Sequence, residues 1–249
     1  MKNSKPILFS ALMIAVIAIS FVGGCKKENN NPVTPWHGKL KTFSYQGFFT
    51  DTLFYDSLGR RIGDSNSRGV RYKYYYSPNK VSEYYFASGS TAPTDSTIYT
   101  LNSAGYMIYS LNSAGYAIND GIRSYHYDAS WHCSSETTAS GRSTYYVWKD
   151  ENLDSIKYFN SSQPTGVWSA TSYTDKPNTI SANEGSGMTW MGKDSKNLRN
   201  GWINYLDGTG TTTYSDTYEF DSKNRVIKMT EIASGANSGT FIKTYSYYD

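Results

Sequence analysis

The chain of 249 residues has little of what would point to a familiar function. It has only two cysteines, Cys25 and Cys133, which excludes a framework of several disulfides. Lys and Arg number 24 against 21 Asp and Glu, so the formal net charge is only +3. Because this balance is close to neutral and no basic stripe runs along the chain, we expect no nucleic acid partner.

The usual signatures of catalysis and cofactor binding are missing from the sequence. There is no G-x-S-x-G, no H-E-x-x-H, no G-x-G-x-x-G and no P-loop. The histidines are only three, His37, His126 and His132. We therefore predict a protein that is not an enzyme and that uses no cofactor.

One local cluster does combine residue types that ligate metals, between His126 and Cys133. Two His, one Asp and one Cys could bind zinc in principle. In an extended strand, however, His126, Asp128 and His132 point to one face and Cys133 to the other. We therefore predict no metal site, and we expect Cys133 to be a buried thiol.

The longest apolar run lies at the N-terminus. Lys2 and Lys5 precede the apolar segment Ile7–Val22, and Gly23-Gly24 follows it. A positive segment, an apolar segment and a small-residue cleavage site predict a secretory signal peptide over residues 1–24. The alternative is a transmembrane anchor, but a span needs roughly 20 apolar residues and this run is shorter.

Val22-Gly23-Gly24-Cys25 resembles the lipobox of bacterial lipoproteins. The resemblance implies cleavage before Cys25, lipidation of that cysteine and attachment of the mature chain to a membrane. Lys26 resembles the sorting signal for the outer membrane, and Lys26-Lys27-Glu28 resembles in part the export signal of Bacteroidetes surface lipoproteins. Residues 25–35 are polar and contain two prolines, so we predict a disordered tether after the lipid. The protein would then face either the cell surface or the periplasm.

Residues 36–249 repeat one local pattern, an aromatic strand followed by a short turn, and we predict one β-rich domain. Tyr99–Ile108 and Tyr109–Ile118 are a near-perfect tandem copy. Each copy has the turn Asn-Ser-Ala-Gly, in which Asn starts a type I turn and Gly takes the left-handed conformation. Similar turns occur at 56–59, 149–152 and 221–224.

The segments between turns alternate in polarity with a period of two. Tyr72, Tyr74 and Tyr76 share one face of a strand, and the last segment places Phe241, Lys243, Tyr245 and Tyr247 on one face. The region of about 160–210 breaks the rhythm. We predict an all-β antiparallel meander of about twelve strands, forming an open twisted sheet or half-barrel, with a two-layer sandwich as the alternative.

The segment Phe54-Tyr55-Asp56-x-x-Gly59-Arg60 resembles the YD (RHS-type) repeat. The wider arrangement, over roughly 41–249, is similar to a family of Bacteroidetes lipoproteins of unknown function built from such hairpins. That family carries no established activity or site residues, so the resemblance implies none here. Shells of true YD repeats need many more copies to enclose a cargo.

Aromatic side chains are the remaining candidates for binding, because their apolar faces stack on sugar rings. The alternative is that these rings form the core of a sheet that is poor in aliphatic residues. We expect a non-catalytic protein that binds a glycan or a partner protein. Two other hypotheses stay open: an adaptor of an envelope complex that docks by a sheet edge, and a hydrolase with an unrecognised site, which requires an acid or His pair converging in a pocket. The candidate ligand-binding residues are Tyr72, Tyr74, Tyr76, Trp168, Trp190 and Trp202.

Overall fold

The computed structural model describes residues 39–112, 122–181, 185–206 and 210–248. All of them belong to one compact unit, Pro35–Asp249. The predicted signal peptide, Cys25, the tether and most of the second copy of the ten-residue repeat lie outside the described residues. No helix in the described part of the chain is long and apolar enough to cross a membrane.

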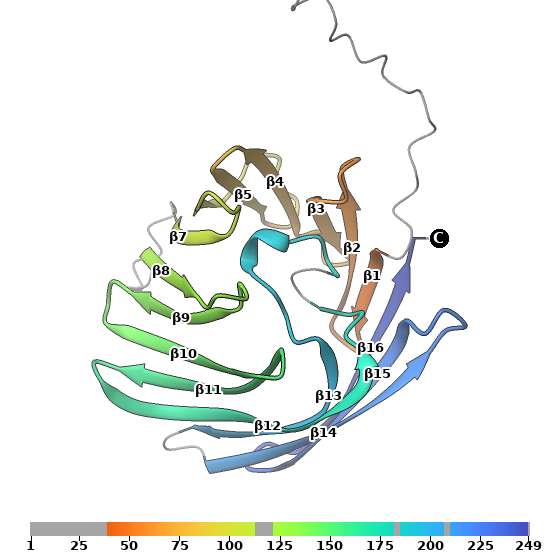
Figure 1. Cartoon of the computed structure of the whole chain (residues 1–249). Coiled ribbons are helices and arrows are strands. Elements are labelled where there is room, and N and C mark those ends of the chain that lie inside the picture. Colours follow the sequence, from red (N-terminus) through yellow and green to blue (C-terminus); the bar gives the residue numbers. More distant parts are fainter. Residues whose placement is uncertain (1–38, 113–121, 182–184, 207–209, 249) are drawn as a thin grey trace, which may run out of the picture. The chain divides into compact units, whose positions relative to one another are not determined.

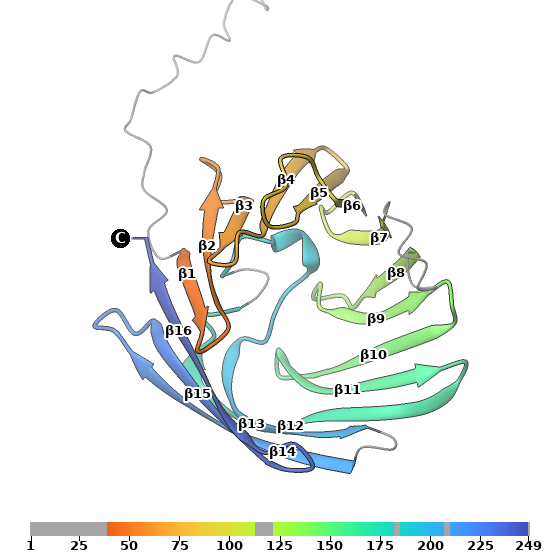
Figure 2. The same cartoon turned by 180° about the vertical axis from the view of Figure 1, so that it is seen from behind.

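The unit is a closed barrel of sixteen antiparallel strands in sequence order (Figures 1 and 2). The ring closes because β1 pairs with β2 on one side and with β16 on the other. A single helical turn, η1 (Thr189–Met191), lies in the connection between β12 and β13. The strands are β1 (Leu40–Tyr45), β2 (Phe49–Tyr55), β3 (Arg61–Asn66), β4 (Arg71–Ser77), β5 (Lys80–Phe86), β6 (Asp95–Leu101), β7 (Met107–Asn112), β8 (Ile122–Tyr127), β9 (Cys133–Thr138), β10 (Arg142–Lys149), β11 (Asn152–Asn160), β12 (Gln163–Pro177), β13 (Asn197–Leu206), β14 (Gly210–Phe220), β15 (Val226–Gly235) and β16 (Gly239–Tyr247).

The predicted open sheet, half-barrel and two-layer sandwich are all wrong. The strands number sixteen rather than about twelve, and the first pairs with the last. The region that breaks the sequence rhythm contains the long strands β12 and β13 as well as the connection between them. Closure removes the unpaired backbone groups that an open sheet would expose at its edges. The sequence prediction missed it because the pairing of the first strand with the last leaves no local sequence pattern.

Inward and outward side chains alternate along the strands, and β14 shows this most clearly. Thr212 and Asp216 are buried, and Tyr214 and Tyr218 are half-buried on the same face. The opposite face of β14 is fully exposed and carries Thr211, Thr213, Ser215, Thr217 and Glu219. The inward face is therefore aromatic and the outward face is polar.

Five hairpin turns share one geometry. The first residue is Asp or Asn, and its Oδ1 accepts hydrogen bonds from the backbone N–H groups of the third and fifth residues at 2.8–3.0 Å. The fourth residue has a positive φ, between 58° and 86°. The turns predicted at Asp56, Asn102 and Asp221 are confirmed. The other two begin at Asn66 and Asp128.

A second repeated contact joins strands in pairs, and we call it the aromatic latch. A Tyr or Trp near the end of an even-numbered strand donates a hydrogen bond to a backbone carbonyl near the start of the strand before it. Several of these carbonyls lie where a bulge shifts the register just after a turn. The latches run from Tyr55 to Leu40 (2.7 Å), Tyr76 to Arg61 (2.6 Å), Trp148 to Cys133 (2.7 Å), Tyr173 to Leu153, Tyr218 to Arg199 (2.8 Å) and Tyr247 to Val226 (2.8 Å).

The connection between β12 and β13 runs inside the ring of strands in both views (Figures 1 and 2), and we call residues 178–181 and 185–196 the lumen connection. Its backbone is bonded to several hairpins. Gly187 O accepts from Arg61 N at 3.2 Å, and the N–H groups of Lys193 and Lys196 donate to the turns after β8 and β10. Gly187 has a φ of +76°, and a Cβ there would lie 2.8 Å from the Tyr55 ring. The lumen connection therefore packs tightly against the barrel wall.

We expect Tyr76→Phe to lower the free energy of unfolding by about 1–2 kcal/mol, because it leaves the Arg61 carbonyl without its donor. Tyr75→Phe is the matched control, since the neighbouring Tyr75 points outward and is 57 % exposed. Urea denaturation of both variants measures the difference. Equal stabilities would show that the latch contributes nothing.

Candidate functional site

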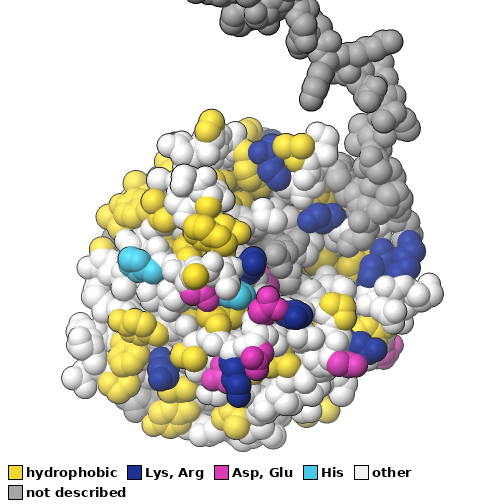
Figure 3. All heavy atoms as spheres, in the orientation of Figure 1, with side chains coloured by type: hydrophobic (Ala, Val, Ile, Leu, Met, Phe, Trp, Pro, Cys, Tyr) yellow, Lys and Arg dark blue, Asp and Glu magenta, His cyan; other side chains and the backbone are white. Residues whose placement is uncertain are grey.

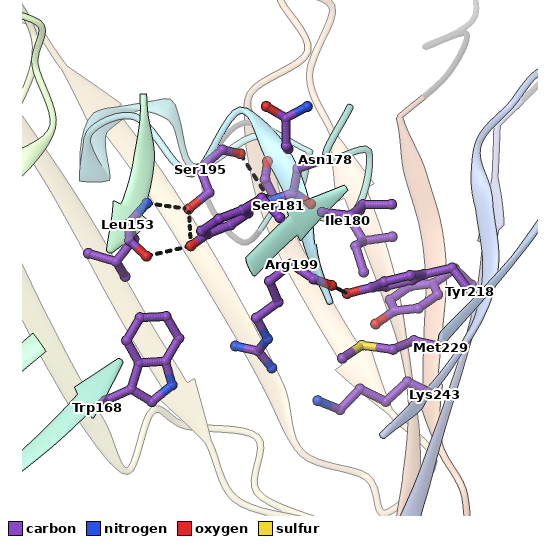
Figure 4. A pocket seen from close by; sticks show the side chains of 14 residues that line it. Leu153, Trp168, Asn178, Ile180, Ser181, Ser195, Arg199, Tyr218, Met229 and Lys243 are labelled. Atoms are coloured by element: carbon purple, nitrogen blue, oxygen red, sulfur yellow. Dashed lines mark hydrogen bonds between the residues drawn. The ribbon is translucent and has the colours of Figure 1, made fainter. Parts of the chain in front are cut away.

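A cavity of about 350 Å³ lies between the lumen connection and the wall formed by strands β11–β16 (Figure 4). This volume is at the lower end of the roughly 300–1,000 Å³ of small-molecule sites. Aromatic, amide, hydroxyl and basic groups all contribute to the lining. The lining residues are Leu153, Trp168, Tyr173, Asn178, Ile180, Ser181, Ser195, Asn197, Leu198, Arg199, Tyr218, Met229, Lys243 and Tyr245.

Three of these residues form one row across the wall. Tyr218 on β14 pairs with Met229 on β15, which pairs in turn with Lys243 on β16. The latch from the Tyr218 hydroxyl to the Arg199 carbonyl fixes the ring at one end of this row. On the other side of the cavity, the Tyr173 hydroxyl is bonded to Leu153 O and lies 3.4 Å from Ser195 Oγ. Strand register and latches thus position the lining.

A buried charge network adjoins the cavity through Arg199. Arg199 Nε is 2.6 Å from Asp216 Oδ2, and Arg199 Nη2 is 3.0 Å from Glu231 Oε2. The Trp202 indole N–H donates to the same Glu231 oxygen at 3.0 Å. Burial raises the pKa of the Asp216 carboxyl against the opposing effect of Arg199, and nearby Glu231 adds to the rise. Two carboxyl groups thus share one guanidinium, and neither lines the cavity.

Lys243 differs from Arg199 in its partners. Its Nζ lies 5.6 Å from the centroid of the Tyr45 ring, a cation–π distance. Within the described ranges, Lys243 forms no ion pair with a carboxylate, and its side chain lines the cavity. Figure 4 shows Lys243 and Arg199 reaching into the cavity, on the other side of which Trp168 lies. The cavity therefore holds one cation that is paired with two carboxylates and one, Lys243, that makes no direct ion pair with a described acid.

The first group of predicted ligand residues lies elsewhere in the lumen. Tyr74 is buried with Trp190 of the lumen connection, and the Trp190 ring lies 4.4 Å from that of Tyr99. Tyr72 and Tyr76 pack against the same cluster. Tyr76 and Trp190 also line a separate hollow of about 410 Å³. The structure thus places these four residues in a packed aromatic cluster rather than on an exposed platform.

The second group, Trp168 and Trp202, lies on the adjacent strands β12 and β13. Their ring centroids are 5.9 Å apart, and Trp202 stacks on Tyr214 with centroids 3.6 Å apart and planes within 2°. Only Trp168 lines the cavity of Figure 4. The six residues therefore do not form one surface, and a ligand-binding role for them stays a prediction.

The residues of the His126–Cys133 cluster are separated by a turn. Asp128 begins this turn, so the segment is not the continuous strand expected from the sequence. His132 is buried, stacks on Trp148 at 4.3 Å and lies 3.2 Å from Asp128, whereas His126 is exposed. In the part of the chain that the structure describes, no three His, Cys, Asp or Glu side chains are grouped to hold a metal ion.

Sequence reasoning missed the charged and hydroxyl residues of the site. Lys243 shares a strand face with Phe241, Tyr245 and Tyr247, and Asp216 lies between Tyr214 and Tyr218. The sequence signal that could have identified both residues is a charged side chain on a strand face that is otherwise largely aromatic. Nothing in the sequence indicates that Arg199 lies beside these strands, because that depends on the pairing of β13 with β14.

Two solved structures share this fold. A porin-like protein from Bacteroides uniformis matches with a TM-score of 0.60 and 15 % identity, over 84 % of this chain and 97 % of that one. A porin-like protein from Bacteroides vulgatus matches with a TM-score of 0.54 and 11 % identity, over 84 % and 98 % of the two chains. No family model and no curated protein matches the chain. At these identities the likeness is one of fold.

We expect the Cys133 thiol to be unreactive in the folded protein. Burial, with a contribution from Glu136, raises its pKa to about 12, so only about one molecule in 10⁴ carries the reactive thiolate at pH 8. In a chain that begins at Lys26, Ellman's reagent should label Cys133 only after unfolding. Cys133→Ser combined with Thr217→Cys is the control, because residue 217 faces outward. Rapid labelling of native Cys133 would contradict the prediction.

Proposed function

We propose that the chain is a lipid-anchored outer-membrane protein, whose barrel stands in water and binds a small glycan in its lumen. The observation that carries the first part is the outer face of β14. All five outward residues of this strand are hydroxyl or acidic residues, namely Thr211, Thr213, Ser215, Thr217 and Glu219. A barrel that spans a membrane instead presents an apolar band about 25 Å tall to the lipid.

The length of the N-terminal strands supports the same proposal. Strands β1–β6 and β9 have six or seven residues each, which corresponds to about 20 Å of extended chain, whereas β11–β16 have 9 to 15 residues. A tilted membrane-spanning strand needs roughly 9–11 residues. Figure 3 has the orientation of Figure 1, which looks into the ring of strands, and shows basic and acidic side chains interspersed with apolar ones at this end of the barrel.

The likeness to the porin-like proteins supports a location at the outer membrane more than a role in transport. Their names associate this fold with porins, and Lys26, which follows the lipobox-like Val22–Cys25, favours the outer membrane for this chain independently. An open sixteen-stranded barrel leaves an aqueous channel. Here the lumen connection crosses the interior and packs on aromatic side chains. We therefore favour a binding role over a pore.

The lining of the cavity supports a glycan as the ligand. The rings of Trp168, Tyr218 and Tyr245 offer apolar faces, and amide and hydroxyl groups of Asn178 and Ser195 lie beside them. Aromatic faces next to hydrogen-bonding groups suit a sugar ring, which has apolar C–H faces and polar hydroxyls. The acid pair Asp216 and Glu231 is held by Arg199 outside the cavity, so we propose no catalytic role for it.

A partner protein is the second candidate ligand. Phe54, Ile62 and Tyr75 line an outward hollow of about 620 Å³ on β2–β4, and each is more than 40 % exposed. Such a hollow favours docking by side chains. Docking by a sheet edge, as the adaptor hypothesis required, does not fit, because every described strand is paired on both sides.

We expect residues 26–249, expressed without the leader and Cys25, to be soluble and monodisperse without detergent, because the outward face of β14 is polar where a membrane-spanning strand would be apolar. Size-exclusion chromatography with light scattering tests this. As a control, the porin-like protein of Bacteroides uniformis can be treated in parallel. Aggregation that only detergent reverses would contradict a barrel standing in water.

We expect a cognate saccharide to stabilise the full-length chain in detergent micelles. At 100 times its dissociation constant a ligand adds about 2.7 kcal/mol, which raises the melting temperature by roughly 5–10 °C at this size. Trp168→Ala should abolish the shift, and Tyr205→Ala, an outward substitution on β13, should not. Shifts that survive Trp168→Ala, or no shift with any saccharide, would argue against lumenal binding.

A further inference from the structure

Lys243 is a cation inside the barrel whose charge the described carboxylates do not balance by an ion pair. It projects from the lumenal face of β16 between the β1 residue Tyr45 and the β15 residue Met229. Its Nζ forms a cation–π contact with the Tyr45 ring, 5.6 Å from the ring centroid. A cation that lines a half-buried cavity without a counter-ion is stabilised when an anion enters.

The other cation of the cavity is not available in the same way. Arg199 makes two short contacts to carboxylates, at 2.6 Å to Asp216 and 3.0 Å to Glu231. Glu231 is held further by the Trp202 indole N–H. Because these two acids are committed to Arg199, an entering anion meets Lys243 as its charge partner.

Aromatic and polar groups line the cavity into which Lys243 projects. Trp168, Tyr218 and Tyr245 line the same cavity as Lys243, and Asn178 and Ser195 approach from the lumen connection (Figure 4). A simple inorganic anion would use the ammonium group and leave the ring faces without contact. A sugar ring that carries an acid group can contact both the Lys243 ammonium group and the aromatic faces.

We propose that the lumenal cavity binds an acidic sugar, a pyranose with a carboxylate substituent. The Lys243 ammonium group pairs with the carboxylate and the aromatic lining contacts the ring. The proposal rests on the proposed function, since it names the class of glycan that the lumen takes. The volume of about 350 Å³ suits one or two rings rather than the interior of a long polymer.

The test compares matched sugars on the full-length chain in detergent micelles, by isothermal titration calorimetry and thermal shift. The probes are glucuronic and galacturonic acid and their neutral parents glucose and galactose, each also as the methyl glycoside, with sodium sulfate as the inorganic anion. The variants are Lys243→Met, Lys243→Arg and Lys243→Glu. Lys157→Met is the control, because Lys157 is exposed on the outside of β11.

We expect the uronic acids to bind at least about tenfold more tightly than the neutral sugars. Lys243→Met should remove most of this preference and Lys243→Arg should retain it, while Lys243→Glu should abolish binding of the acids. Lys157→Met should bind like the unchanged chain. Equal melting temperatures of all variants without ligand would show that the changes act on binding rather than on folding.

Three outcomes would overturn the proposal. Neutral sugars that bind as tightly as the acids, unaffected by Lys243→Met, would leave lumenal glycan binding intact but refute the acidic preference. Sulfate that binds as tightly as the uronic acids and depends on Lys243 would reveal a simple anion site without ring recognition. No binding of any sugar, with every variant folded, would refute the proposed glycan function together with this inference.

Discussion

The barrel depends on one constraint: backbone carbonyl groups near the starts of its strands need hydrogen-bond donors. A bulge after a turn takes a residue out of the ladder, and a buried carbonyl without a donor is costly. In six strand pairs the solution is a Tyr or Trp whose polar atom reaches the carbonyl of the preceding strand, as in Tyr76 to Arg61 and Tyr247 to Val226. An aliphatic side chain cannot replace it, which accounts for part of the 24 tyrosines in the chain.

The latches also place aromatic rings on the lumenal side of the wall. The rings that form the latches lie on the lumenal face, and the outward face of β14 carries small polar residues. Outward residues of the neighbouring strands also include apolar side chains such as Ile203 and Ile232. Buried Asp216 and exposed Ser215 and Thr217, neighbours on β14, show how sharply the two faces differ. On β14, rings inside and hydroxyls outside are the reverse of the pattern in a membrane-spanning strand beside a water-filled lumen.

Local features of the fold could be predicted from the sequence, but distant pairing could not. The turns at Asp56, Asn102 and Asp221 are visible because one side chain and one positive-φ residue define each turn. Closure rests on contacts such as Thr42 to Ser246, 204 residues apart, which no period reveals. The site divides in the same way. Trp168 could be singled out as an aromatic, whereas Lys243 and Arg199 become neighbours of one cavity only after β13–β16 have paired.

The lumen connection divides the interior of the barrel and leaves a cavity beside it. A ring of sixteen strands alone encloses a wide space, and the connection reduces the part next to β12–β16 to about 350 Å³ while supplying Asn178 and Ser195 to the lining. The wall supplies the aromatic faces and the positive charge of Lys243. The connection therefore sets the size of the cavity and adds polar groups to it, and the wall adds the aromatic faces and the positive charge.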